Sequence, residues 1–112
     1  MASAQLGTVL RHLRGMAHTQ ADEGTSDREL LRRYVAGREE AAFVALLRRH
    51  GPMVLSVCRR AGGNLQDAED AFQATFLVLA RKAASVVPPE AVGHWLYGVA
   101  YRAAQKAREA TP

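Results

Sequence analysis

Hydrophobic residues along the chain recur at intervals of three and four positions, which predicts helices rather than strands. The first such run covers residues ~4–16 and places five apolar side chains on one face: Leu6, Val9, Leu10, Leu13 and Met16. We expect a short amphipathic helix there. The polar, turn-rich segment that follows predicts a flexible linker, so residues 1–26 form an N-terminal extension.

The next two helices are predicted by their end signals as well as by periodicity. Ser26 with Glu29 forms a capping-box pattern, and Gly37 is a candidate helix end. The apolar row between them is Leu30, Leu31, Tyr34 and Val35. A longer helix is expected from about Glu39 to Arg60, with the apolar row Phe43, Leu46, Leu47, Val54, Val57 and Cys58. Gly51-Pro52 should kink or break it near His50, and Gly62-Gly63 should stop it.

Two further helices complete the predicted fold. Asn64 can cap a fourth helix that runs to about Ala83. Ser85-Val86-Val87-Pro88-Pro89 predicts a stiff, non-helical connector, and the last helix should occupy about Glu90 to Ala110. The 112 residues, of which 48% are hydrophobic and 23% charged, suit one small domain. The expected class is all-α: a small compact bundle of three to four main helices with a short N-terminal amphipathic helix.

The fourth predicted helix has a polar face that packing does not require. At about 100° per residue, one arc is apolar and should be core: Ala68, Phe72, Thr75, Phe76 and Leu79. The opposite arc holds Gln66, Glu69, Asp70 and Gln73, with Leu77 at its centre. A charged arc is usually only a solvated surface, but a central leucine favours a docking surface.

The last predicted helix has an outward face that combines cations with aromatic rings. Its inward row is Leu96, Val99, Ala100, Ala103 and Ala107. The outward residues are His94, Tyr101, Arg102, Gln105 and Arg108, with Trp95 and Lys106 along one edge. Gly98 lies near the centre, where it would allow a partner backbone to approach. Rings that stack on bases beside cations that hold phosphates suit single-stranded nucleic acid. The alternative is that Trp95 and Tyr97 are core edges and the cations only solubilise the helix.

Charge and cysteine usage narrow the function classes. The net charge is +4, and its distribution is uneven. Residues 64–80 carry three acids and no base, whereas residues 81–112 carry five bases and two acids. Such asymmetry suggests two different partners. Cys58 is the only cysteine, so an internal disulfide is excluded. No apolar stretch is long enough for a membrane span or a signal peptide, so we expect the cytoplasm.

Catalytic and metal chemistry find no support in the sequence. The four histidines are scattered, and neither a phosphate-binding glycine loop nor a triad-like spacing is present. We therefore expect no enzyme activity, no cofactor and no metal. Cys58 lies on the apolar row and should be a buried thiol.

Two motifs resemble region 2 of the sigma-70 family of bacterial RNA polymerase sigma factors. Residues 67–76 read D-A-E-D-A-F-Q-A-T-F, and residues 94–102 read H-W-L-Y-G-V-A-Y-R. They look most like the extracytoplasmic-function group, and the H-G-P-M-V run of residues 50–54 matches the preceding helix of that domain. The opening Q-L-G-T-V-L-R-H-L-R is similar to N-terminal extensions of planctomycete members. The resemblance covers residues ~27–110, which it identifies as the region 2 domain.

The resemblance implies two binding surfaces. In the family the D-A-E-D helix docks on the clamp helices of the β′ subunit of core RNA polymerase. By position, the implied polymerase contacts are Asp67, Glu69, Asp70, Gln73 and Leu77. The connector and last helix correspond to the reader of the −10 promoter element, which captures bases of the melted non-template strand. The implied DNA contacts are Ser85, Val86, Val87, His94, Trp95, Tyr97, Tyr101, Arg102, Gln105 and Lys106.

The sequence differs from the family pattern in several features, and these differences leave alternative functions open. Gly98 and Arg102 stand where the family often has a basic residue and an asparagine, so the promoter sequence does not transfer. The second domain of the family, a helix-turn-helix that reads the −35 element (region 4), is absent, and we expect the chain to be a fragment of a longer factor. The rival function is an interaction module that binds polymerase or an anti-sigma factor without recognising DNA. An anti-sigma factor is also a candidate partner of the full domain.

Overall fold

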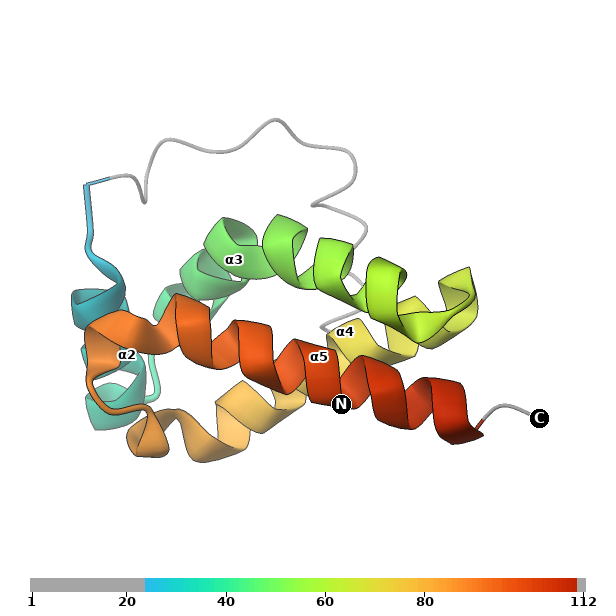
Figure 1. The fold of residues 1–112 in the computed structure, drawn as a ribbon. Coiled ribbons are helices and arrows are strands. Elements are labelled where there is room, and N and C mark those ends of the chain that lie inside the picture. Colours follow the sequence, from blue (N-terminus) through green and yellow to red (C-terminus); the bar gives the residue numbers. More distant parts are fainter. Residues whose placement is uncertain (1–23, 111–112) are drawn as a thin grey trace.

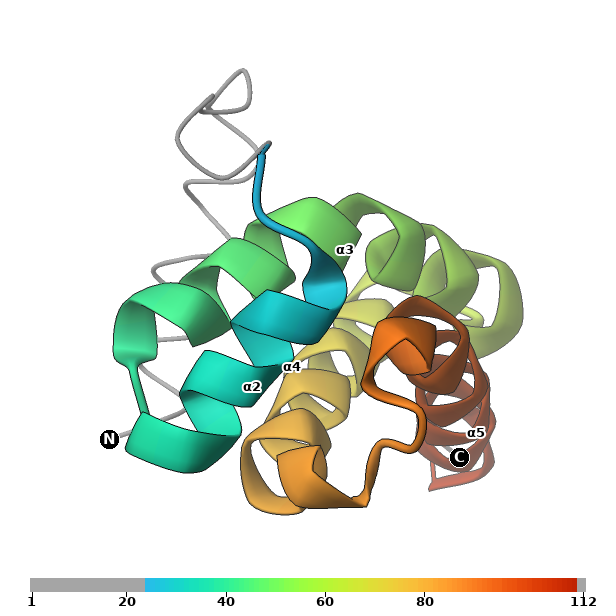
Figure 2. The ribbon, with the colours of Figure 1, turned by 90° about the vertical axis from the view of Figure 1, so that its left-hand side faces the viewer.

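The computed structural model describes residues 24–110, so the helix predicted at residues ~4–16 lies outside the described residues. The described part is helical and contains no strand, which confirms the all-α bundle. It comprises helices α2 (Asp27–Gly37), α3 (Glu40–Gly62), α4 (Leu65–Lys82) and α5 (Val92–Ala110), and the short 3-10 turns η2 (Ala83–Ser85) and η3 (Pro89–Ala91). Helices α3, α4 and α5 pack against one another, and α2 lies at one end of the bundle beside α3 and the 3-10 turns (Figures 1 and 2).

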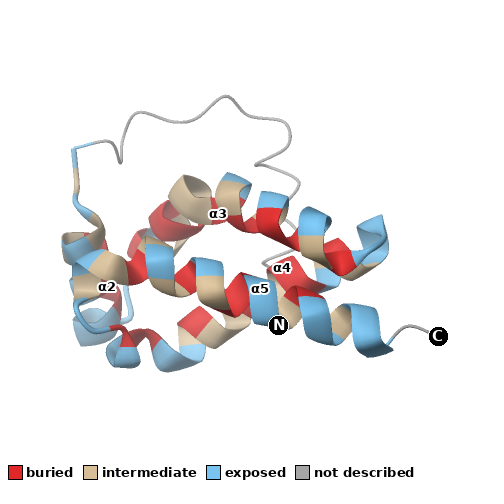
Figure 3. Ribbon diagram, viewed as in Figure 1, coloured by how far each residue is buried: buried red, intermediate tan, exposed pale blue. Residues whose placement is uncertain are grey.

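The buried faces of the helices meet in one core (Figure 3). Within this core, aromatic rings connect three helices. Tyr34 of α2 contacts Phe43 of α3 at 5.1 Å between ring centroids, and Phe43 meets Phe76 of α4 edge-on at 6.4 Å. Phe72 and Phe76 are fully buried and lie 5.1 Å apart. Burial of each such side chain stabilises the fold by about 1.5–3 kcal/mol. The predicted apolar rows are confirmed as buried for Leu46, Leu47, Val54, Val57, Cys58, Ala68, Phe72, Thr75, Phe76 and Leu79.

Two apolar rows differ from the prediction at their edges. In α5, Ala104 is fully buried, whereas Ala103 and Ala107, predicted to point inward, are only partly buried. The reason is that α5 packs against both α3 and α4, which broadens its buried arc toward α3. In α2, Val35 was expected in the core but is 40% exposed.

Helix ends follow the predicted capping residues closely. The Ser26 hydroxyl accepts a hydrogen bond from the backbone N–H of Glu29 at 3.0 Å. The Asn64 side-chain oxygen accepts one from the N–H of Asp67 at 2.7 Å. Both contacts satisfy a donor that an uncapped helix leaves without a partner. Gly37 is the last residue of α2, but the left-handed conformation that closes the helix belongs to Arg38, with φ of 52°.

The predicted interruption of the long helix is not a break. Helix α3 continues through Gly51 and Pro52 as one element and ends at Gly62, before Gly63 with a φ of 89°. Proline has no N–H to donate to the carbonyl of Arg48, which weakens the helix locally. The ribbon of α3 changes direction in its middle (Figure 2). The structure therefore has the predicted kink but not the predicted break.

A charged cluster fixes the start of α2 against the middle of α3. One carboxylate oxygen of Asp27, Oδ1, accepts a hydrogen bond from Nη1 of Arg49 at 2.9 Å, and the other, Oδ2, lies 3.0 Å from Nε2 of His50. These side chains are only 14–27% exposed. The His50 ring in turn lies 3.1 Å from where a Cβ would sit on Gly93, at the start of α5. One residue of α3 therefore positions two neighbouring helices.

Helix α3 is the one element of residues 24–110 with the length and hydropathy of a membrane span, at a mean hydropathy of 1.2. Its apolar side chains, however, form the centre of the bundle. The core helix of a soluble protein can have the same length and hydropathy as a membrane span, so these two properties do not assign α3 to a membrane.

Candidate functional site

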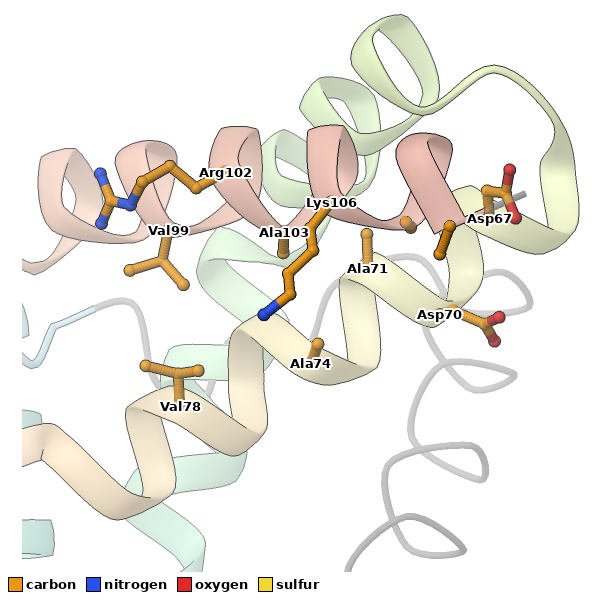
Figure 4. Close-up of a pocket in the computed structure, with 11 residues that line it drawn as sticks. Asp67, Asp70, Ala71, Ala74, Val78, Val99, Arg102, Ala103 and Lys106 are labelled. Atoms are coloured by element: carbon orange, nitrogen blue, oxygen red, sulfur yellow. The ribbon is translucent and has the colours of Figure 1, made fainter. Parts of the chain in front are cut away.

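A groove runs between α4 and α5 and has an apolar floor with charged rims (Figure 4). We call it the α4–α5 groove; its volume is about 640 Å³. Small side chains form most of the floor: Ala71, Ala74, Val78, Val99, Ala103, Ala107 and Ala110. Asp67 and Asp70 on α4, and Arg102 and Lys106 on α5, complete the lining. The helices approach closely here because alanines separate them, which brings the acidic and the basic helix to one groove.

Of the five predicted polymerase contacts on α4, Asp70 is exposed and the other four are partly buried. Asp70 is exposed, and its carboxylate accepts a hydrogen bond from the Gln66 amide at 3.0 Å. Glu69 and Gln73 are half-buried, and Leu77 packs partly against the core. Asp67 lies in the first turn, where the helix dipole favours a carboxylate. The surface formed by Asp67, Glu69, Asp70, Gln73 and Leu77 is termed the acidic α4 face below.

The basic residues on the α4 side of α5 adopt two different directions. The Lys106 side chain extends across the groove toward α4 near Ala74 (Figure 4). Arg102 instead runs back along α5, and its guanidinium lies 3.3 Å from the position of a Cβ on Gly98. Arg102 of the same helix lies over Gly98, so the approach of a partner backbone there requires this exposed side chain to move. Trp95, on this side of α5 by helical spacing, is partly buried against the core.

The remaining aromatic residues of α5 lie on its other side, against α3. Tyr97 and Tyr101 are 47% and 45% exposed. They line a second groove of about 330 Å³, the α3–α5 groove, together with Val57, Arg60, Ala61, Gln105 and Arg108. The prediction placed Tyr101 and Arg102 on one outward face with Trp95 and Lys106 along its edge, and the resemblance added Tyr97 as a DNA contact. The structure instead distributes them to two sides of α5.

The connector exposes the side chain of Val87 to solvent and buries that of the preceding Val86. Val87 is 81% exposed, and Ser85 is exposed at the end of η2. Val86 was predicted to contact DNA, but it is buried in the core and its N–H donates to the carbonyl of Ala83 at 3.2 Å. Val86 therefore anchors the connector. The ends of the predicted non-helical stretch, Ser85 and Pro89, belong to the 3-10 turns.

Residues outside the prediction complete the α3–α5 groove. Arg60 of α3, which was not among the predicted site residues, lines the groove beside the two tyrosines. Periodicity places Arg60 on a flank of α3, but only the packing of α3 against α5 shows which residues it meets. Arg108 was assigned to the outward face of the last helix and forms part of the same groove.

The thiol of Cys58 is part of the buried core. Cys58 is fully buried, as predicted, and burial raises the pKa of its thiol to about 11, although a hydrogen bond with Thr75 opposes this. A thiol with that pKa carries little thiolate at neutral pH. Within residues 24–110, no three His, Cys, Asp or Glu side chains gather at a distance suited to one metal ion.

These features define a class: a small helical interaction domain with an acidic helix face next to a cationic and aromatic helix. A family model described as Sigma-70 region 2 matches residues 46–110, which is more than half of the chain. The chain therefore belongs to the sigma-70 region 2 family. The match begins inside α3 and includes all of α4 and α5. Among curated proteins and solved structures, none matches the chain.

Membership of the sigma-70 region 2 family indicates the broad function of the chain. Sigma-70 region 2 is a domain of transcription initiation factors and is not a catalytic family. It is involved in polymerase binding and promoter melting, and its partners are core RNA polymerase and promoter DNA. The two surfaces on α4 and α5 both lie within the matched residues.

Proposed function

We propose that the chain is region 2 of an extracytoplasmic-function type sigma factor, which docks on core RNA polymerase through the acidic α4 face. The exposed carboxylate of Asp70, two helical turns from the partly buried Leu77, carries this assignment. A cationic coiled coil such as the β′ clamp helices would meet charge-assisted hydrogen bonds around an apolar centre. Its site of action would then be the cytoplasm, where polymerase and DNA are.

The DNA-binding part of the function rests on α5 and the connector. Exposed rings, cations and one amide of α5 would bind the melted non-template strand of the −10 element: His94, Tyr97, Tyr101, Arg102, Gln105 and Lys106. Ser85 and the exposed Val87 would contact a base taken out of the stack, which costs a few kcal/mol that stacking must offset. Trp95 is partly buried, and its exposed part would add to this surface. Val86 is left out because it is buried.

The docking assignment is tested by charge reversal. Asp70→Lys should abolish the pull-down of core RNA polymerase, because it places a cation against a cationic partner. The matched control is Glu109→Lys, an equal charge change at an exposed position near the end of α5. Retention of polymerase by Asp70→Lys, or equal loss with Glu109→Lys, would defeat the assignment.

The DNA assignment is tested on the complex with core polymerase. Replacement of Trp95 and Arg102 by alanine should weaken single-stranded DNA binding by about 1–3 kcal/mol for each stacked base that is lost. Fluorescence anisotropy of a labelled, randomised single-stranded DNA measures this without knowledge of the promoter. An unchanged affinity would favour the rival function, an interaction module that binds polymerase or an anti-sigma factor and does not recognise DNA.

A further inference from the structure

We propose that His50 is a positioning residue: through Gly93 it sets where α5 begins, and with it the place of the connector between α4 and α5. This inference rests on the proposed function, in which the connector contacts a base taken out of the stack. His50 itself touches no DNA and acts only through the segment that it holds. Its link to the connector runs through α2, which lies before the residues that the family model matches.

The end of the connector at α4 is fixed by two side chains of α2. The Tyr34 hydroxyl donates a hydrogen bond to the backbone carbonyl of Ala80, near the end of α4, at 3.3 Å, and Nη1 of Arg38 donates to the same carbonyl at 3.2 Å. The Arg38 guanidinium also lies over the Tyr34 ring, 4.3 Å from its centroid. The turn η2 begins three residues after Ala80, and Val86 is buried in the core. This end of the connector is therefore anchored.

The end of the connector at α5 depends on contacts that start on the same helix. Oδ2 of Asp27, the first residue of α2, lies 3.0 Å from Nε2 of His50, while Oδ1 accepts a hydrogen bond from Arg49. Because an ionised carboxylate only accepts hydrogen bonds, Nε2 of His50 is the donor. The His50 side chain is only 14% exposed. The ring is thus held in one orientation and loses its partner if it turns toward solvent.

Gly93 is the position at which the His50 ring meets α5. A Cβ on residue 93 would lie 3.1 Å from Cε1 and 3.4 Å from Nδ1 of the ring. The shorter distance is tighter than most Cβ contacts, so either the ring or the helix would have to shift by a few tenths of an ångström. Since Asp27 holds the ring, we expect the shift to fall on the start of α5 and on η3, which leads directly into it.

Helix α2 connects the two anchors. It packs against both η2 and η3, in which the connector begins and ends (Figure 2). Tyr34 and Arg38 hold the first anchor from the C-terminal part of α2, and Asp27 holds the second from its first residue. A loop that is held at both ends keeps its shape before DNA arrives, which lowers the cost of ordering it on binding.

Two substitutions separate the contact with His50 from the loss of the glycine itself. Gly93→Ala introduces the Cβ that meets the ring. His50→Gln keeps an amide donor for Asp27 but lacks the two ring atoms that face residue 93. The matched control is Gly37→Ala, the same change at a position where a Cβ would meet only Cγ of Glu39, at 3.9 Å.

The experiment measures two affinities of the full chain: for core RNA polymerase and, as their complex, for randomised single-stranded DNA. Gly93→Ala should weaken DNA binding about fivefold, the smallest effect expected when one stacked base is lost. Polymerase binding should not change, because Asp67 and Asp70 lie at the end of α4 opposite to η2. Adding His50→Gln to Gly93→Ala should recover most of the DNA affinity, and Gly37→Ala should behave as wild type.

A second variant tests the same contact without a clash. His50→Ala removes the ring from both Asp27 and Gly93, so the start of α5 loses its support and DNA binding should also weaken. Circular dichroism establishes that each variant is folded at the assay temperature. If Gly93→Ala does not fold, wild-type DNA affinity in His50→Ala overturns the inference.

The remaining outcomes separate this inference from the proposed function. Equal losses of DNA and polymerase binding in Gly93→Ala would overturn the positioning role, because the substitution would then act on the whole bundle. No recovery in the double variant would overturn it as well, since the effect would not pass through His50. If replacement of Trp95 and Arg102 weakens DNA binding but Gly93→Ala does not, the positioning role fails and the proposed function stands. If the wild-type complex binds DNA no better than core polymerase does, both fail.

Discussion

Removal of the cap of α4 should lower stability and weaken polymerase binding together. In Asn64→Ala the N–H of Asp67 loses the side-chain oxygen that accepts its hydrogen bond at 2.7 Å. Loss of an N-cap costs about 1 kcal/mol, within a range of about 0.5–2. For a domain of this size, 1 kcal/mol lowers the melting temperature by roughly 4–8 °C. The same turn carries Asp67 and leads into Glu69 and Asp70, so fraying there should also disorder the acidic α4 face.

Circular dichroism during thermal unfolding measures the first effect, and a polymerase pull-down measures the second. Asn64→Asp is the matched variant, because aspartate accepts the same hydrogen bond and its charge suits the helix N-terminus. It should unfold at or above the wild-type temperature. If Asn64→Ala and Asn64→Asp unfold at the same temperature as the wild type, the cap does not stabilise α4 and the reasoning is refuted.

Two further predictions concern the core. Phe76→Ala should destabilise the fold by about 3–5 kcal/mol in denaturant unfolding, because Phe76 is fully buried between two other rings; a loss under 1 kcal/mol would contradict the aromatic core. For Cys58, the folded pKa of about 11 lies above the ordinary value of 9.0, so the protonated thiol stabilises the fold. That contribution is complete below pH 9 and is lost as pH rises toward 11. Wild-type stability should therefore fall more steeply above pH 9 than that of Cys58→Ala, and parallel curves would exclude the effect.

Local signals in the sequence predicted the helices well because the energetic terms involved are local. The Asn64 cap, the Gly62-Gly63 stop and the apolar rows around Phe72 and Phe76 each depend on spacing within one helix, and the structure confirms them. Pro52 was harder to interpret. Its ring removes one backbone hydrogen bond, but the packing of α3 against three neighbours holds the helix together across that position.

The arrangement of the α5 surface could not be read from the sequence. A helical wheel gives the direction of each side chain, but it does not say which neighbour lies there. The tyrosines face α3 and the basic residues border α4, and this split depends on tertiary packing. Arg60 illustrates the same limit, because its partners across the groove are some forty residues away in sequence. Val86 appeared to belong to an open loop, yet the short 3-10 turn before it directs its side chain into the core.

The most direct measurement of the central claim is the affinity of core RNA polymerase for single-stranded DNA, with and without the chain, in two variants. Wild-type chain should raise the DNA affinity of the complex. Asp70→Lys should lose both polymerase binding and this gain, whereas Arg102→Ala with Lys106→Ala should keep polymerase binding and lose only the gain. The opposite pattern, in which the α5 variant loses polymerase and Asp70→Lys keeps it, would contradict the assignment of the two faces.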